Sequence, residues 1–90
     1  MNKQDLVKRI AHDAEVTQRQ ASVMVESMIN IVMEAVAKGE KVQLLGFGTF
    51  EARHRAARVG RNPTTGEAVE IPEAVVPMFK PGQEFKEMVD

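Results

Sequence analysis

Residues 46–66 read GFGTFEARHRAARVGRNPTTG, and this stretch is the most informative part of the chain. Between residues 51 and 70 the only large apolar side chains are Val59 and Val69. A β-hairpin formed from these residues has no core face to bury, and an isolated two-stranded ribbon is only marginally stable in water. We therefore expect an arm that projects from the protein body and is ordered against a ligand.

Positive charge is concentrated in this predicted arm. The whole chain has a net charge of −1, which by itself argues against binding to nucleic acid, yet residues 41–80 carry a net charge of +2. Within residues 53–61 there is no acidic residue and there are four arginines: Arg53, Arg55, Arg58 and Arg61. The forked guanidinium group binds phosphates and suits the negative potential of a narrow minor groove. The pattern favours a DNA-binding ribbon, and a solvated basic strand face is the alternative.

Residues 60–66 have the composition of a tight turn, with Pro63 at its tip. Proline is apolar and rigid, and it has no N–H group that needs a partner. Such a side chain is a candidate wedge that enters between base pairs and kinks the duplex. The alternative is that Pro63 serves only the turn.

Two capped helices are expected before the strands. Asn2 is suited to cap a first helix that ends near residue 14. Thr17 and Gln20 have the spacing of a capping box at the start of a second helix. That helix is expected to run to about residue 38, where Gly39 is well placed to end it.

The second helix is apolar over an unusually wide arc. Placed at 100° steps, its apolar residues cover roughly 200°, whereas a helix on the surface of a monomer needs only about 100°. These residues are Ala21, Met24, Val25, Met28, Ile29, Ile31, Val32, Met33, Ala35 and Val36. A chain of 90 residues without cysteine also has few other ways to enlarge a thin core. We therefore expect a second chain to cover part of this helix, the alternative being harmless exposure of Met and Ala.

The remainder of the chain alternates between apolar and polar residues. This alternation predicts a strand at 42–44, a second strand over 49–58 and a return strand over 67–71, which Pro72 interrupts and residues 75–79 resume. Residues 83–89 are expected to form a short closing helix. This order of elements predicts one α+β domain.

Several classes of protein do not fit the sequence. No apolar run is long enough for a membrane span, and the first residues do not read as a signal peptide, so we expect an intracellular, soluble protein. Cysteine is absent, and His12 and His54 have no companions at ligand or catalytic spacing. We therefore expect no metal site and no enzymatic activity.

These motifs resemble those of a known family. The run Gly46-Phe47-Gly48-Thr49-Phe50-Glu51, then Arg55, Arg58, Gly60, Arg61-Asn62-Pro63 and Thr65-Gly66, is similar to the signature of the bacterial histone-like HU proteins and the integration host factor group. The resemblance extends over the whole chain. It implies an intertwined dimer in which each chain contributes to a helical base, a three-stranded antiparallel sheet, a protruding two-stranded β-ribbon arm and a short C-terminal helix. The segments would be 1–40 for the base, 41–82 for the sheet with an arm at about 53–74, and 83–90 for the closing helix.

The resemblance also implies a function and its residues. Such proteins wrap and bend duplex DNA through the minor groove, largely without sequence preference, favour bent, nicked or gapped DNA, and associate with the nucleoid in the cytoplasm. Pro63 would intercalate. The implied DNA contacts are Lys3, Arg53, Arg55, Arg58, Arg61, Asn62, Pro63, Thr65, Lys80 and Lys86. The implied dimer interface comprises Met28, Ile29, Val32, Val36, Leu44, Phe47, Phe50 and Phe79. No cofactor is implied.

The sequence also departs from the family. HU proteins are typically basic, whereas Glu67 and Glu70 stand here on the returning arm strand, and Gln18 and Gln83 replace residues that are often basic. Fewer phosphate contacts predict weaker and less salt-dependent binding. Three alternatives stay open: a sequence-preferring subunit of the integration host factor type, a heterodimer with a basic paralogue, and a structural or protein-interaction dimer with weakened DNA binding.

Overall fold

Three helices and five strands follow one another along residues 1–90, all of which the computed structural model describes. The elements are α1 (Lys3–Ala14), α2 (Gln18–Ala37), β1 (Val42–Leu44), β2 (Gly48–Arg55), β3 (Arg58–Arg61), β4 (Ala68–Ile71), β5 (Ala74–Pro81) and α3 (Gln83–Val89). Residues 1–34 and 35–90 form two units. The predicted division into base, sheet, arm and closing helix stays a prediction.

Both predicted capping boxes are present. The Asn2 side chain accepts a hydrogen bond from the Asp5 backbone N–H at 2.9 Å, and the Asp5 carboxylate accepts one from the Asn2 N–H at 3.2 Å. Thr17 and Gln20 make the equivalent reciprocal pair, each at 3.0 Å. These bonds satisfy N–H groups that have no partner within a helix, so they fix where α1 and α2 begin.

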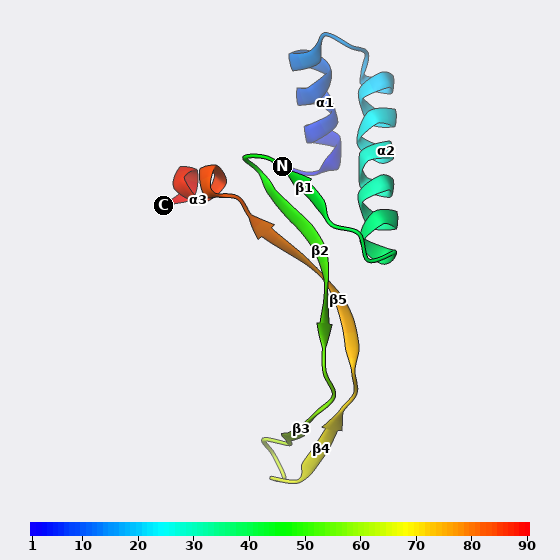
Figure 1. Ribbon diagram of the computed structural model, residues 1–90. Helices are drawn as coiled ribbons and strands as arrows, with labels where there is room; N and C mark the ends of the chain where they lie inside the picture. Colours follow the sequence, from blue (N-terminus) through cyan, green and yellow to red (C-terminus); the bar gives the residue numbers. More distant parts are fainter. The chain divides into compact units, whose positions relative to one another are not determined.

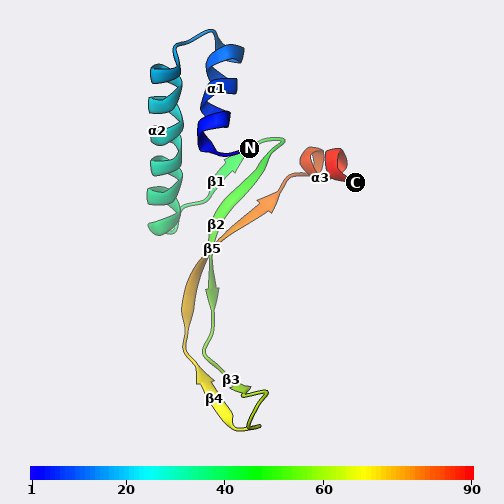
Figure 2. The ribbon, with the colours of Figure 1, turned by 180° about the vertical axis from the view of Figure 1, so that it is seen from behind.

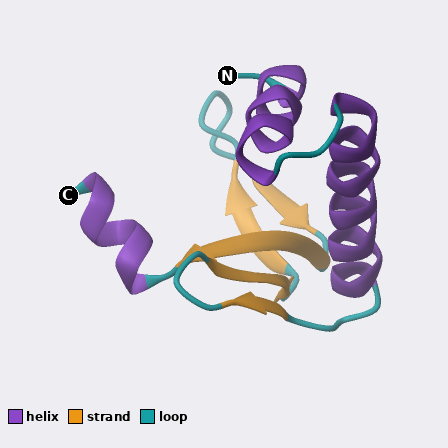
Figure 3. Ribbon diagram, turned by 90° about the horizontal axis from the view of Figure 1, so that it is seen from above, coloured by secondary structure: helices purple, strands orange, loops and turns teal.

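α1 and α2 lie side by side as a helical hairpin (Figures 1 and 3). The helices meet through small and branched side chains, and the buried cluster consists of Val7, Ala11, Ala21 and Val25. Ile10, Val16 and Ile29 pack against this cluster. Because Ala21 has no exposed surface, the two helices approach closely at this point. The contact uses one stripe of α2 and leaves its outer apolar side chains exposed.

The sheet of the second unit has the strand order β1-β2-β5, and every pairing is antiparallel. Phe50 on β2 lies opposite Phe79 on β5, and their ring centroids are 4.8 Å apart. Phe47, from the turn after β1, lies 5.1 Å from Phe79 and 5.7 Å from Phe85 on α3. All four phenylalanines of the chain therefore form one cluster that joins α3 to the sheet.

Gly48 explains how closely β2 approaches β5. A Cβ atom at this position would lie 2.5 Å from the backbone oxygen of Lys80 and 2.6 Å from the ring of Phe79. Both distances are shorter than real Cβ contacts, so only glycine fits here without displacing the sheet or the aromatic cluster.

The arm is a ribbon whose hydrogen-bonded ladder is interrupted once. β2 and β5 pair as far as Arg55 and Ala74, and β3 and β4 then pair from Arg58 and Ile71 as a separate two-stranded sheet. The predicted continuous strand over 49–58 is therefore wrong at residues 56 and 57. In the register of the flanking pairs, residue 57 lies opposite Pro72 and residue 56 lies opposite Glu73. Pro72 has no N–H to donate to the ladder and restricts the residue before it. Figure 2 shows the β3–β4 hairpin beyond the end of the three-stranded sheet.

The α+β class, the three-stranded antiparallel sheet, the two-stranded ribbon and the C-terminal helix are confirmed. No helix combines the length and the apolar character that crossing a membrane requires.

Candidate nucleic-acid interface

The tip of the arm is closed by its own hydrogen bonds. The backbone N–H of Asn62 donates to the backbone carbonyl oxygen of Glu67 at 2.9 Å, and the backbone N–H of Gly66 donates to the backbone carbonyl oxygen of Asn62 at 2.7 Å. The side chains of Asn62 and Thr65 accept from the backbone N–H groups of Thr64 (2.9 Å) and Glu67 (3.3 Å). The two polar residues that sequence reasoning assigned to DNA contact therefore also hold the loop that presents Pro63.

Pro63 itself is exposed and lies within this loop. The hydrogen bonds that close the loop run between residues on both sides of it, and proline adds no donor of its own. The structure thus presents a rigid apolar group at the far end of a two-stranded ribbon. That is the geometry required of a side chain that enters between stacked bases.

The four arm arginines are all exposed, and none of them makes an ion pair. Arg53 and Arg55 alternate along one face of β2, whereas Arg58 and Arg61 lie three residues apart on β3 and so project from opposite faces of the ribbon. Guanidinium groups without a carboxylate partner are free to bind an external anion, and here they follow the ribbon toward its tip.

The acidic residues of the arm do not neutralise these arginines. Glu70 lies opposite Val59, and Glu73 is 2.6 Å from the Nε2 atom of His54. Glu67, at the end of the tip loop, makes no ion pair. The carboxylates therefore lower the net charge of the arm without occupying its arginines.

The lysines assigned to DNA contact differ from the arginines. Lys3 pairs with Glu26 on α2, and Lys80 pairs with Glu51, whereas Lys86 on α3 makes no ion pair. Sequence reasoning missed Glu51 and a second lysine beside it, Lys41. Only the register of three strands brings these residues together, and no local pattern indicates it.

The predicted interface residues are unevenly covered in the single chain. Met28, Leu44 and Phe47 are exposed (53%, 37% and 44%), whereas Val36 is buried (9%). The remaining four are partly covered: Ile29, Val32, Phe50 and Phe79. Each of the two units therefore exposes large apolar side chains, Met28 in the first and Leu44 and Phe47 in the second, and exposed apolar side chains of this size are typical of a surface that another molecule covers.

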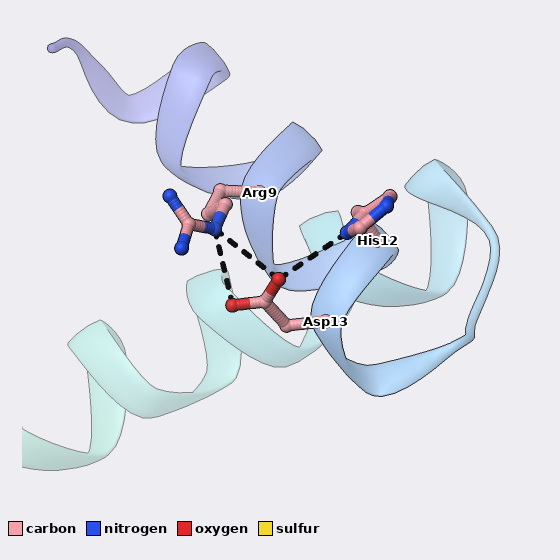
Figure 4. Close-up of polar contacts among 3 residues, drawn as sticks. All are labelled: Arg9, His12 and Asp13. Atoms are coloured by element: carbon pink, nitrogen blue, oxygen red, sulfur yellow. Dashed lines mark hydrogen bonds and ion pairs between the residues drawn. The ribbon is translucent and has the colours of Figure 1, made fainter.

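Both histidines lie beside carboxylates on the surface, His12 beside Asp13 and His54 beside Glu73. The Asp13 carboxylate accepts from the Nε atom of Arg9 at 3.1 Å and lies 3.3 Å from the Nδ1 atom of His12 (Figure 4). The hydrogen bond with His12 and the nearby Arg9 hold the pKa of Asp13 below its ordinary value. All three side chains are exposed and lie on the last turns of α1, where a basic residue is favourable.

An arginine-bearing ribbon with a proline at its tip, attached to a small sheet and preceded by a helical hairpin, defines a class of DNA-binding proteins, and comparison with known proteins supports this class. The model of the family described as bacterial DNA-binding protein matches residues 1–90, and the chain belongs to that family. DNA-binding protein HU of Clostridium pasteurianum is 51% identical over 90 residues, which cover 100% of this chain and 99% of that protein. DNA-binding protein HU of Staphylococcus aureus (strain COL) is 48% identical over 89 residues, which cover 99% of each.

Comparison with solved structures also finds HU proteins. The Anabaena HU–DNA cocrystal structure matches with a TM-score of 0.89 and 48% identity over 99% of this chain and 97% of that chain. HU from Thermotoga maritima matches with a TM-score of 0.70 and 32% identity, and the whole of both chains is covered.

Proposed function

We propose that this protein is an architectural DNA-binding protein of the bacterial nucleoid, which binds double-stranded DNA largely without sequence preference and bends it. It performs no chemistry. The observation that carries the proposal is the ribbon with four exposed arginines, none of them in an ion pair, and an exposed proline at its closed tip. Unpaired guanidinium groups bind phosphate oxygens through charge-assisted, often bidentate, hydrogen bonds.

The arm is proposed to lie in the minor groove. A narrow minor groove has an enhanced negative potential that attracts arginine. Arg58 and Arg61 project from opposite faces of the ribbon, so they are placed to contact both walls of the groove or both flanking backbones. Lys3, Lys80 and Lys86 would add contacts to phosphates outside the groove.

Pro63 is proposed to intercalate between base pairs. Unstacking one step costs a few kcal/mol, which the additional contacts along a bent duplex offset. Asn62 and Thr65 support this role, because their side-chain oxygens accept the hydrogen bonds that hold the tip loop closed. A duplex that is already bent, nicked or gapped avoids part of the unstacking cost, so such DNA should bind more tightly.

A second copy of the chain is proposed as the other partner. Only five apolar side chains are buried, whereas α2 exposes Met24, Met28, Ile31 and Met33 by 49–61%. On the sheet side Phe47 is 44% exposed, and an open cavity of about 550 Å³ lies beside Phe79 and Phe85. Apolar surface of this extent is unfavourable in water and is the kind of surface that a homodimer buries.

We predict that Met28→Glu dissociates the dimer. A glutamate buried without a partner at a dimer interface costs several kcal/mol, so the dimer dissociation constant should rise at least about 100-fold. Asn30→Glu is the matched control, because residue 30 is also exposed on α2 but lies 200° around the helix from residue 28. Analytical ultracentrifugation measures both variants. A wild-type protein that sediments with the mass of one chain, 10.0 kDa, would contradict the dimer.

Bending is tested by fluorescence energy transfer across a short duplex labelled at its two ends. The wild-type protein should increase transfer, because bending brings the ends together, and it should do so on duplexes of unrelated sequence. Binding that leaves the transfer unchanged would contradict an architectural role. If energy transfer increases on one DNA sequence only, the result would favour a sequence-preferring subunit of the integration host factor type.

A further inference from the structure

Glu51 lies between two lysines on the sheet. Its side chain is only 11% exposed, and its two oxygens face different ammonium groups. The Nζ atom of Lys80 is 2.7 Å from Oε1, and the Nζ atom of Lys41 is 3.5 Å from Oε2. The hydrogen bond from Lys80 lowers the pKa of Glu51, against the opposing effect of burial, so this group is a carboxylate at neutral pH.

Strand register explains the cluster. Val42 on β1 lies opposite Phe50, so Lys41, one residue before β1, lies beside Glu51. On the other side of β2, Lys80 lies opposite Thr49, two residues from Glu51 on the same face. Arg53 and Arg55 continue this face toward the arm. One face of the sheet therefore carries four cations and a single acid, and the aromatic cluster occupies the opposite face.

We infer that Lys41 and Lys80 form a phosphate-binding site on this face of the sheet, and that Glu51 is the internal counter-ion with which a DNA backbone phosphate competes. The inference rests on the proposed DNA binding and assigns it two residues, Lys41 and Glu51, that carry no role in the proposed function. The site continues the row of arm arginines from the ribbon onto the sheet.

The geometry allows a phosphate to reach both lysines. Their side chains are 73% and 57% exposed, in contrast to the covered carboxylate. An ammonium group has three N–H donors, so Lys80 retains two after donating to Glu51. Glu51 nevertheless neutralises part of the charge, so each contact with DNA releases less counterion than a free lysine would. The carboxylate thereby sets how strongly this face binds DNA and how steeply binding depends on salt.

The test compares Glu51→Gln with Glu40→Gln. Each removes one negative charge, and Glu40 is exposed, adjacent to Lys41 and without an ion pair. Both variants are titrated against duplex DNA at several salt concentrations. Glu51→Gln should steepen the slope of log binding constant against log salt by about 0.9 for each lysine released from Glu51. For one lysine, a fourfold rise in salt should then lower the affinity of the variant about threefold more than it lowers that of the wild-type protein. Glu40→Gln should change the slope much less. Equal slopes for the two variants would overturn the inference.

A second arm of the experiment uses Lys80→Gln in two backgrounds. In the wild-type protein Lys80 is partly neutralised by Glu51, so its removal should make the slope shallower by less than about 0.9. In the Glu51→Gln background Lys80 is no longer neutralised, so its removal should make the slope shallower by the full amount of about 0.9 that one phosphate contact contributes. Equal changes in the two backgrounds would overturn the inference.

Thermal melts confirm that each variant is folded, and the comparison between backgrounds remains valid if Glu51→Gln is moderately destabilised. If the wild-type protein fails to bind DNA at low salt, the proposed function itself is wrong. If the wild-type protein binds and Glu51→Gln behaves as Glu40→Gln does, only this inference fails.

Discussion

Replacing the four arm arginines, Arg53, Arg55, Arg58 and Arg61, with glutamine is expected to weaken binding to duplex DNA about 100-fold or more. Hydrogen bonds between charged groups contribute about 1.5–3 kcal/mol each, and non-specific binding to DNA is almost entirely electrostatic. The slope of log binding constant against log salt should become shallower by about 0.9 for each phosphate that the variant no longer neutralises. Fluorescence anisotropy of a labelled duplex measures both quantities.

A second comparison separates the effect of where the arginines lie on the arm from the effect of the protein's net charge. Arg58→Gln with Arg61→Gln is compared with Arg9→Gln combined with Arg19→Gln on the helical hairpin, because each pair removes two positive charges. The arm pair should lower the slope by about 1.8, and the helix pair should change it little. Equal effects would show that net charge, and not the position of the arginines on the ribbon, drives binding.

Replacing Pro63 with alanine should abolish most of the bending while much of the binding remains. The arginines that supply the electrostatic attraction are unaffected, but alanine is too small to wedge a base step open, so neither the kink nor the additional interactions along a bent duplex can form. End-to-end energy transfer on the labelled duplex should therefore fall toward the value of free DNA, whereas the salt slope should keep the part that the arm arginines contribute.

Thr64→Ala is the matched control, because this residue is in the same exposed loop and contributes only its backbone N–H to the hydrogen bonds of the tip. It should bend DNA as the wild-type protein does. Undiminished bending by Pro63→Ala would refute intercalation. Loss of bending by both variants would assign the effect to the shape of the loop instead of to proline.

Local features were predictable from the sequence because their causes are local. The capping boxes at Asn2 and Thr17 depend on residues three positions apart, and both are present. The scarcity of large apolar side chains between residues 51 and 70 predicted a ribbon, and the turn composition around Pro63 predicted its tip. Gly48 belongs to the recognisable motif, and the structure shows what requires it, namely the close approach of Lys80 and Phe79.

Non-local features were not predictable in the same way. The break after Arg55 lies where Pro72, seventeen residues later, comes opposite residue 57, and only the pairing register shows this. The contact between Glu51 and Lys80 likewise needs the register of β2 and β5. Lys3 and Lys80 read as free cations in the sequence, whereas their carboxylate partners come from other elements of the fold.

One titration tests the central claim most directly. The wild-type protein is titrated against an intact and a nicked duplex of equal length at several salt concentrations. Arms that bend DNA by opening a base step predict tighter binding to the nicked duplex, falling with salt along a slope of about −0.9 per phosphate contact. Because Glu67 and Glu70 lower the charge of the arm, this slope should be shallower than that of a basic member of the family. Equal affinity for the two duplexes, or no binding to either at low salt, would contradict the account.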